Sequence, residues 1–249
     1  MSLPNVSSIS SVSIVTVTQY SRRNILPLLH ECINKQTFLP DEWIIVEGSR
    51  TPEDAQKNAE QIEALRNASE HKIVYLPYQA NSTLASLRNR GHLACTSDVI
   101  VCMDDDDYYP PSRIKHVIQQ MNKYPDRLIA GCTNLLMYDY QHRTLYQFKG
   151  IHENHATQAT MAFHKSYLTN HKHDELLEKA EESSFTNHFS EPMVQLCSFD
   201  TVIASSHTIN TVDKKDMLVN NPYFQKLEDS ELEKYFPMDM FKKYEKQFT

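Results

Sequence analysis

Short apolar runs alternate, along the first half of the chain, with longer stretches in which apolar residues recur every three or four positions. The short runs, which predict buried strands, lie at residues 12–18, 43–46, 73–76 and 99–103. The stretches with helical spacing lie at residues 25–33, 51–65, 84–94 and 114–121. Strands that alternate with helices favour right-handed crossovers and a mostly parallel sheet. We therefore expect an α/β fold with helices on both faces of the sheet.

The pattern changes after about residue 125. Further strands separated by turn residues are predicted at residues 128–138, 143–148 and 159–164, which indicates a mixed sheet in the second half. From Ser230 onward, Phe241, Tyr244 and Phe248 recur at helical spacing among lysines, which predicts a helical tail. No repeat or linker divides the 249 residues, so we expect one domain. Its parts are residues 12–125, 126–212 and 213–249.

Composition narrows the possible partners and the compartment. Lysine and arginine number 25 against 32 acids, and the formal charge of −7 disfavours binding to nucleic acid. No window approaches the roughly 18 apolar residues of a membrane helix, and the first eleven residues do not resemble a signal peptide. Five cysteines without a C-x-x-C pair favour a reducing compartment, so we expect a cytoplasmic protein. The aromatic tail is expected to pack on its own domain, because peripheral membrane contact is the rarer use of such a stripe.

The strongest chemical signal is the run of four aspartates in VIVCMDDDDYYPP, residues 99–111. Four neighbouring carboxylates repel one another, and a cation would stabilise them. In an extended stretch Asp104 and Asp106 would point to one side. Two hard oxygen donors there suit Mg²⁺ or Mn²⁺, with water and substrate phosphates as further ligands. The alternative is a solvated acidic turn that caps the next helix. Four acids directly after an apolar strand favour the metal site.

Four stretches of the chain carry motifs that occur together in one enzyme family. They are SIVTVTQYSRR at 13–23, WIIVEGS at 43–49, LASLRNRGHLACTSDVIVCMDDDDYYPP at 84–111 and AEESSF at 180–185. The third holds an Arg-Asn-x-Gly element and a D-x-D motif, and a His-x-x-Asn begins at His207. Together they resemble a family 2 glycosyltransferase of the GT-A fold. The resemblance implies a Rossmann-type α/β/α sandwich with a mostly parallel central sheet and a mixed acceptor-side half.

The resemblance also implies a reaction and its residues. A nucleoside-diphosphate sugar, expected to be UDP-linked, would pass its sugar with inversion to a hydroxyl of a carbohydrate or glycoconjugate, with Mn²⁺ or Mg²⁺ bound. Donor contacts are implied for Thr16, Thr18, Tyr20, Glu47, Arg88, Asp104 and Asp105. Metal contacts are implied for Asp106, Asp104 and His207. The base would be Glu182, with Glu181 in a supporting role.

Several alternatives remain open at this point. Arg88 can be a surface arginine, Glu47 a turn acid, and the two glutamates acids at a helix N-terminus. Because Glu47 stands where the family has an acidic pair, the choice between uridine and guanosine is open. A nucleotidyltransferase would also hold Mg²⁺ on acids after a strand, but it needs a Gly-rich loop and the chain has four glycines. The other alternative is a sugar-nucleotide-binding module without a working base.

The four stretches all end before about residue 212. We therefore expect the tail after Ser230 to lie outside the catalytic core, so that removing it would leave a folded protein that still binds the donor.

Overall fold

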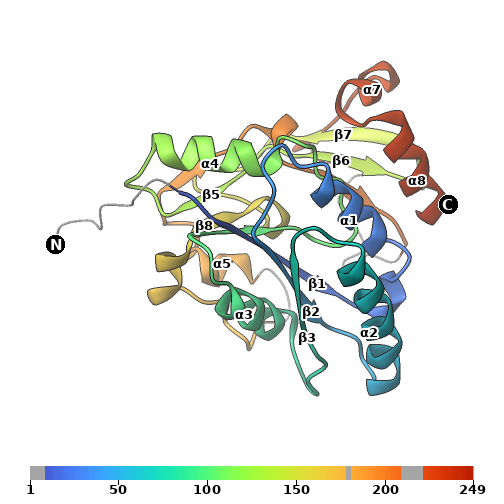
Figure 1. Cartoon of the computed structure of the whole chain (residues 1–249). Coiled ribbons are helices and arrows are strands. Elements are labelled where there is room, and N and C mark those ends of the chain that lie inside the picture. The colour runs from blue at the N-terminus through green and yellow to red at the C-terminus, as the bar shows by residue number, and fades with distance from the viewer. Residues whose placement is uncertain (1–8, 178–180, 209–220, 249) are drawn as a thin grey trace.

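The computed structural model describes residues 9–177, 181–208 and 221–248 (Figure 1). Within these residues a seven-stranded sheet has the order β3-β2-β1-β4-β8-β5-β9. Four parallel strands make up its first half: β1 (Val12–Thr18), β2 (Glu42–Glu47), β3 (Lys72–Leu76) and β4 (Val99–Cys102). β8 (Ala162–His164) runs antiparallel between β4 and β5 (Ile129–Gly131), and β9 (Met193–Gln195) lies parallel to β5.

Helices cover both faces of this sheet. One face packs on α1 (Leu26–Asn34), α2 (Pro52–Asn67) and α4 (Arg113–Lys123). The other face packs on α3 (Leu84–Ala94) and on α5 (Glu182–Phe185). Alternation along β1 produces the two layers, because Ile14 joins the first apolar cluster and Val15 the second. The predicted α/β/α sandwich with a mostly parallel sheet is confirmed.

Gly91 lets α3 lie directly on the sheet. A Cβ atom at Gly91 would come within 2.7 Å of Val15 Cγ1 and 2.9 Å of Val46 Cγ2, so a side chain would push the helix away. Glycine weakens a helix by roughly 0.5–1 kcal/mol relative to alanine, and the close contact explains its place here. The contact also fixes Arg88, one turn earlier, near the carboxyl ends of β1 and β4.

A second sheet, in the order β10-β6-β7-β11, forms the rest of the molecule. Its strands are β6 (Leu136–Asp139), β7 (Thr144–Phe148), β10 (Ile203–Ser206) and β11 (Phe224–Lys226). The single strand predicted over residues 128–138 is divided between β5 and β6, because the chain leaves the larger sheet after Gly131. A bridge between Tyr108 and Ile203 joins the turn after β4 to β10. Because β5 pairs antiparallel with β8 and parallel with β9, the predicted mixed sheet in the second half is confirmed.

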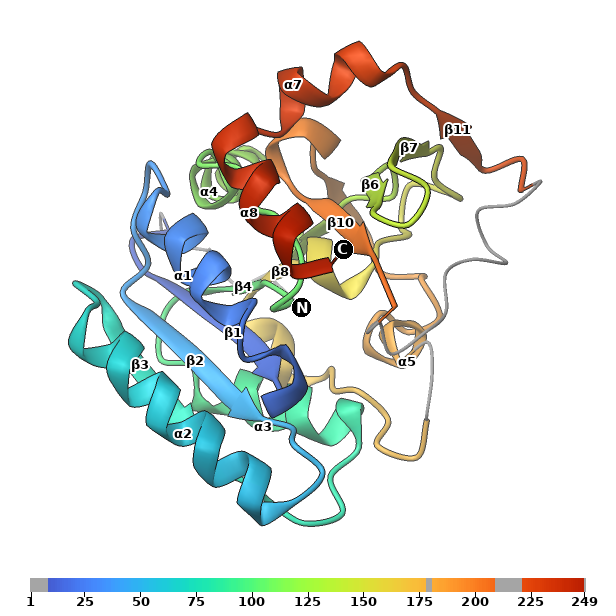
Figure 2. The ribbon, with the colours of Figure 1, turned by 90° about the vertical axis from the view of Figure 1, so that its right-hand side faces the viewer.

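The C-terminal helices α7 (Leu232–Tyr235) and α8 (Met238–Phe248) belong to the main core. Figure 2 shows α8 between α1 and β10. Phe236, Met240, Phe241 and Tyr244 are buried in the same apolar cluster as the strands of the larger sheet. The expectation that the tail lies outside the catalytic core is therefore wrong. Its aromatic stripe packs on its own domain, as predicted.

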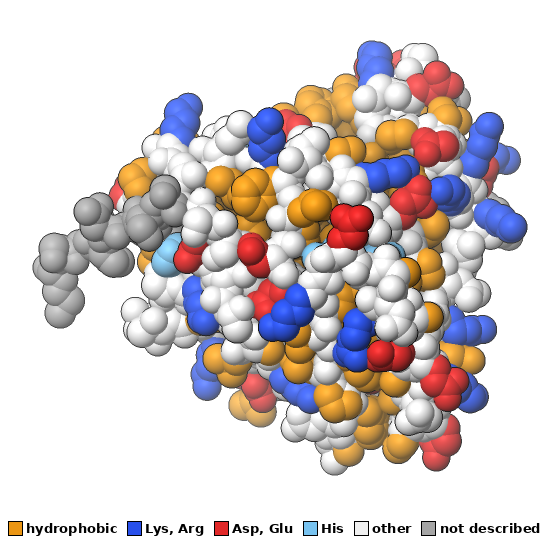
Figure 3. Space-filling view, viewed as in Figure 1, with side chains coloured by type: hydrophobic (Ala, Val, Ile, Leu, Met, Phe, Trp, Pro, Cys, Tyr) orange, Lys and Arg blue, Asp and Glu red, His pale blue; other side chains and the backbone are white. Residues whose placement is uncertain are grey.

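The described surface carries charges of both signs. On the face shown in Figure 3, lysine and arginine side chains are interspersed with aspartate and glutamate and form no continuous stripe. Among the helices that the structure describes, none is long and apolar enough to cross a membrane.

Candidate active site

The four aspartates form a turn directly after β4, at the carboxyl ends of the parallel strands. Ligands of open α/β sheets bind at this edge. Asp105 is fully buried and accepts a 2.8 Å hydrogen bond from Thr18 Oγ1. Arg22 Nη1 lies 2.7 Å from Asp105 Oδ1 and 3.2 Å from Asp106 Oδ2. The ends of β1 and β4 thus meet in one cluster of charged groups.

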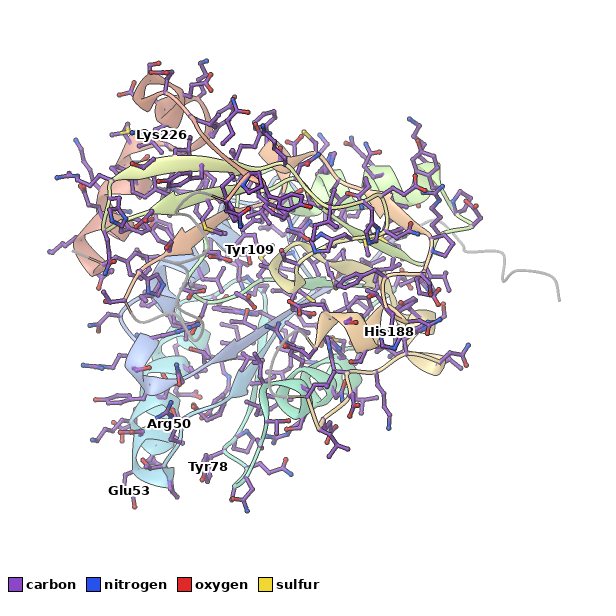
Figure 4. The ribbon with its side chains drawn as sticks, turned by 180° about the vertical axis from the view of Figure 1, so that it is seen from behind. Arg50, Glu53, Tyr78, Tyr109, His188 and Lys226 are labelled. Carbon is purple, nitrogen blue, oxygen red and sulfur yellow. The ribbon has the colours of Figure 1, made fainter. Side chains whose placement is uncertain are left out.

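The turn sends Asp104 and Asp106 in different directions. Asp104 Oδ1 lies 3.4 Å from Arg88 Nη1, and the Asp104 amide donates to the hydroxyl of Tyr109. Tyr109 is buried in the interior, as Figure 4 shows. Asp106 instead faces His207 and Arg22. The expectation that Asp104 and Asp106 share one side is wrong, because side-chain alternation holds for an extended strand and these residues form a turn.

Asp106 and His207 are brought together from positions 101 residues apart. His207 follows β10, and its Nε2 lies 3.1 Å from Asp106 Oδ2. The described residues contain no group of three or more histidine, cysteine or acidic side chains arranged to hold a metal ion. The expected third ligand, Asp104, is therefore not part of the arrangement. One carboxylate and one imidazole still fit a divalent ion whose other ligands are water and phosphate oxygens, and the Arg22 guanidinium beside Asp106 shows that this point attracts a cation.

Arg22 is a site residue that sequence reasoning missed. It belongs to the short helix η1 (Tyr20–Arg22), which follows β1 closely. Burial alone would lower the pKa of Arg22, but the carboxylates of Asp105 and Asp106 raise it above its ordinary value. The guanidinium therefore stays charged and offsets part of the repulsion within the acidic turn. Its place in the first matching stretch, after Tyr20, was the only available signal.

Arg88 connects the acidic turn to the two glutamates. Its Nε donates to Glu181 Oε1 at 2.9 Å, while its Nη1 lies 3.4 Å from Asp104 Oδ1. The Arg88 side chain is only 10% exposed, so the alternative of a surface helix arginine is wrong. One buried side chain thus touches both halves of the predicted site, which places the acids predicted to face the donor close to those predicted to face the acceptor.

The adjacent glutamates have different environments. Glu181 is buried and paired with Arg88, whereas Glu182 Oε1 accepts a 3.3 Å hydrogen bond from the amide of Gln158. Burial, and after it the neighbouring charge of Glu181, raises the pKa of Glu182 above the ordinary glutamate value. A raised pKa makes a carboxylate a stronger proton acceptor at neutral pH. Gln158, in the short helix η2 (Gln158–Thr160), gave no signal in the sequence.

A second group of residues behind the glutamates holds their backbone. The side-chain amide of Asn89 donates to the carbonyl of His173 at 2.9 Å and accepts from the His173 amide at 2.9 Å. His173 Nδ1 lies 3.1 Å from the carbonyl oxygen of Glu181. Arg88 and Asn89 are adjacent on α3. Arg88 therefore holds the Glu181 side chain, and Asn89 holds the backbone at His173, which precedes it. The Arg-Asn-x-Gly element marked Asn89, but its partner His173 was missed.

Thr16 faces the interior of the sheet sandwich. It is buried, and its hydroxyl accepts a 2.9 Å hydrogen bond from Trp43 Nε1 on β2. Thr16 lies on the opposite face of β1 from Val15, on the side covered by α1. This geometry gives Thr16 a packing role between β1 and β2 and does not favour the donor contact that the resemblance implied.

Glu47 and Tyr20 lie in one hydrogen-bonded loop. Glu47 is buried at the end of β2, where Oε1 accepts from the Ser49 amide at 2.8 Å. Its Oε2 accepts from Asn58 Nδ2 at 2.8 Å and from the Tyr75 hydroxyl at 2.7 Å. Ser49 Oγ in turn accepts from the Tyr20 amide at 2.8 Å. Glu47 therefore shapes the loop that carries Tyr20, and direct contacts of either residue with a nucleoside stay predictions.

The layout is that of a GT-A glycosyltransferase: an acidic turn at the carboxyl edge of an α/β sheet, linked by a buried arginine to acids of the second half. The family described as "Glycosyl transferase family 2" matches residues 13–174. The chain belongs to this family.

Two curated proteins are similar in sequence. The chain is 34% identical over 110 residues to the uncharacterized glycosyltransferase YwdF of Bacillus subtilis, a match that covers 44% of this chain and 38% of YwdF. It is 29% identical over 101 residues to the amylovoran biosynthesis glycosyltransferase AmsE of Erwinia amylovora, covering 41% and 36% of the two chains. The matches thus span less than two fifths of either relative.

Two solved structures share the fold. The chain superimposes on S. aureus TarS 1–349 in complex with UDP-GlcNAc with a TM-score of 0.58 and 19% identity, covering 79% of this chain and 58% of TarS. The mannosyltransferase PcManGT of Pyrobaculum calidifontis, in complex with GDP-Man and Mn²⁺, gives a TM-score of 0.62 at 10% identity, covering 83% and 60%. Both likenesses support the GT-A fold.

Proposed function

We propose that the protein is a metal-dependent inverting glycosyltransferase that moves a sugar from a nucleoside-diphosphate sugar to an acceptor hydroxyl. The observation that carries this proposal is the double contact of Arg88 with Asp104 and Glu181. Because one buried side chain touches both, the acids assigned to the donor and the acids assigned to the acceptor form a single site.

On the donor side, Asp106 and His207 are the residues that would hold Mn²⁺ or Mg²⁺. A divalent ion bound there would neutralise the charge that develops on the leaving diphosphate. Arg22 and Arg88 lie beside the acids and are suited to charge-assisted hydrogen bonds with phosphate oxygens. Thr18 holds Asp105 in place at 2.8 Å, so this aspartate keeps its position whether or not it touches the donor.

On the acceptor side, Glu182 is the proposed general base. Its carboxylate would take the proton of the acceptor hydroxyl while that oxygen attacks the anomeric carbon, from the side opposite the leaving diphosphate. The bond from the anomeric carbon to the diphosphate breaks as the new glycosidic bond forms, which inverts the configuration. A positioned base contributes roughly 10²–10⁴-fold to such a step. Glu181 supports this arrangement through its contact with Arg88.

We favour a UDP-linked donor and a carbohydrate or glycoconjugate acceptor. TarS was solved with UDP-GlcNAc, which supports a UDP-linked donor. PcManGT was solved with GDP-Man and Mn²⁺, so the test also includes guanosine-linked donors. The five free cysteines favour a reducing compartment, so a cytoplasmic location stays our prediction.

The decisive measurement is thermal unfolding with a panel of nucleotide sugars, with Mn²⁺ or with a chelator. A ligand present at 100 times its Kd stabilises the native state by about 2.7 kcal/mol. We expect a UDP-sugar with Mn²⁺ to raise the unfolding temperature and the chelator to remove most of the effect. In Asp106→Asn, the metal-dependent part should vanish while the circular dichroism spectrum stays unchanged.

The catalytic part is tested by transfer and donor hydrolysis with the two glutamine variants. Glu182→Gln should keep donor binding and lose roughly 10²-fold or more in kcat. Glu181→Gln should change the acceptor KM more than kcat, as expected for lost uniform binding. Equal donor affinity with and without metal would refute the metal site. Full turnover in Glu182→Gln would move the base to another residue, and donor binding without any transfer or hydrolysis would favour the non-catalytic module.

A further inference from the structure

The last turn of α8 contacts both loops that carry the proposed metal ligands. The Phe248 ring is stacked on the imidazole of His207, with ring centroids 3.9 Å apart and planes inclined by 8°. One turn earlier, the hydroxyl of Tyr244 donates a 2.9 Å hydrogen bond to the carbonyl of Asp107. Residues four apart lie on one face of a helix. A single helical face therefore touches the acidic turn after β4 and the histidine after β10.

These contacts restrain the side chain of His207. Its side chain is fully buried, and Nε2 points toward Asp106 Oδ2 at 3.1 Å. That contact fixes one edge of the imidazole. The stacked Phe248 ring covers one face of the imidazole and so restrains tilting of the ring out of its plane. Nearby, Asp107 Oδ1 accepts from the Ser205 amide at 2.7 Å, which ties the acidic turn to β10.

We propose that α8 positions the metal ligands: Phe248 sets the orientation of the His207 ring, and Tyr244 sets the backbone of the acidic turn beside Asp106. Metal affinity then depends on the last turn of the described chain. The inference rests on the proposed metal site, and it adds to that site two positioning residues that neither the family resemblance nor the sequence pattern assigns.

Phe248 can be separated from the folding role of its helix. Phe241 and Tyr244 are buried in the main core, whereas Phe248 is half-buried and packs on Tyr140 and His207 at the end of α8. Removing the Phe248 ring should therefore affect the orientation of His207 more than the stability of the protein. Changes to groups that orient a metal ligand cost roughly 10–100-fold in metal affinity, so we expect the lower end, roughly 10-fold, for a stacking contact.

The test is a titration of the full chain with Mn²⁺ in the presence of UDP. Electron paramagnetic resonance measures the concentration of the free ion at each point. Phe248→Ala should weaken Mn²⁺ binding roughly 10-fold, and Phe248→Trp, which keeps an aromatic face over the imidazole, should restore most of it. Tyr235→Ala is the matched control, because it removes an aromatic ring of the same C-terminal segment that stacks on Phe199 at 4.5 Å. Tyr244→Phe keeps the ring in the core and removes the hydroxyl that donates to the Asp107 carbonyl at 2.9 Å and lies 3.7 Å from Cys32 Sγ, so it should weaken binding without loss of fold.

A metal-free measurement tests the contact itself. In the wild type, the stacked ring should shift the NMR signals of the His207 imidazole upfield, and Phe248→Ala should remove that shift. If the shift is lost while Mn²⁺ affinity stays at the wild-type value, the positioning role is refuted and the metal site stands. If the wild type and Asp106→Asn both fail to bind Mn²⁺, the proposed metal site fails, and the positioning role falls with it. The two failures are therefore distinguished by the wild type alone.

Discussion

Glu182 and Glu181 show how one residue of separation changes a carboxylate. Glu181 has a cationic partner, Arg88, at 2.9 Å, while Glu182 has a backbone amide at 3.3 Å. Burial raises the pKa of Glu182, and the nearby charge of Glu181 adds to the effect. The same burial that suits Glu182 to the proposed role of base also makes its ionised form costly to the fold, because desolvation and the charge of Glu181 together outweigh the attraction of Arg88.

Because of this cost, we predict that Glu182→Gln gains stability in a pH-dependent way. Since the folded-state pKa is raised, the folded protein binds this proton more tightly than the unfolded chain. The contribution of Glu182 to stability is complete below the unfolded-state pKa and is lost as pH rises through the folded-state pKa. Glu182→Gln should therefore unfold at a higher temperature than the wild type at pH 7, with the difference disappearing near pH 4. Thermal unfolding between these pH values measures it.

Glu181→Gln provides the opposite control. It removes the carboxylate that faces Arg88, so this variant should be less stable than the wild type at pH 7. If both glutamine variants change stability in the same direction at pH 7, the assignment of different environments to the two acids is wrong.

The Arg88–Glu181 ion pair predicts that substitutions of the two residues have strongly coupled effects on the free energy of unfolding. Both side chains are at most 10% exposed, and loss of one partner of a buried ion pair costs about 3–5 kcal/mol because the other charge stays buried. Arg88→Met should lower the free energy of unfolding by about this amount, measured by urea denaturation. The double variant with Glu181→Gln should lose much less than the sum of the single losses. Additive losses would show that the two side chains do not interact.

At the scale of whole elements, the C-terminal helices complete the core. α8 and the residue that follows α7 supply four buried side chains at the corner between the two sheets: Phe236, Met240, Phe241 and Tyr244. Burial of each large apolar side chain is worth roughly 1.5–3 kcal/mol. Four of them give roughly 6–12 kcal/mol, which is comparable with the whole stability of a typical domain, about 5–15 kcal/mol.

Truncation after Ser230 should therefore unfold the protein. The expected result is insoluble protein, or soluble protein that has lost its near-ultraviolet circular dichroism. Tyr235→Ala is a suitable control, because this half-buried residue stacks on Phe199 outside the buried set and its loss should leave the fold intact. A truncated chain with native circular dichroism and cooperative unfolding would show that the tail is dispensable after all.

A buried pair of histidines links α3 to the segment before α5. The rings of His92 and His173 lie 5.4 Å apart, and His173 stacks on Phe185 at 4.4 Å. His92 Nδ1 and His173 Nε2 have no hydrogen-bond partner among the described residues. Burial lowers the pKa of His173 to about 4 and that of His92 well below its ordinary value. Both rings are therefore neutral at pH 7.

For the molecule as a whole, this pair predicts sensitivity to acid. Between the ordinary histidine pKa of 6.5 and about 4, the unfolded chain binds protons that the folded protein does not, so stability falls as pH falls. Each such histidine contributes at most about 1.4 kcal/mol per pH unit. His92→Phe should reduce the slope of stability against pH, between pH 7 and pH 5, by up to one such contribution, and the phenyl ring can keep the packing on Phe163 and Phe185.

Urea denaturation at pH 7, 6 and 5 gives the slope for the wild type and for His92→Phe. His152→Phe is a control for the loss of an exposed histidine, because His152 lies at the surface and its ring contacts are with His155 and Phe189. Equal slopes for the wild type and His92→Phe would show that His92 does not contribute to the acid sensitivity.

Local patterns in the sequence were enough to predict the first half of the fold. Apolar runs such as VSIVTVT indicate buried strands. The helical spacing of Ile114, Val117, Ile118 and Met121 indicates an amphipathic helix, and both patterns are local. The same holds for the acidic run after β4 and for the motifs that indicated the family. These features lie within short stretches of chain, so no long-range contact is needed to see them.

Which side chains contact one another depends on how distant parts of the chain pack. The proximity of Asp106 to His207, the double contact of Arg88 and the contact of Arg22 with Asp105 all join distant parts of the chain. Periodicity shows that α8 has an apolar face but not what that face covers. For this reason the expectation that the tail lies outside the catalytic core was wrong. The alternation expected of the aspartates failed for a related reason: packing turned the chain there, and side-chain direction follows the backbone that the whole fold imposes.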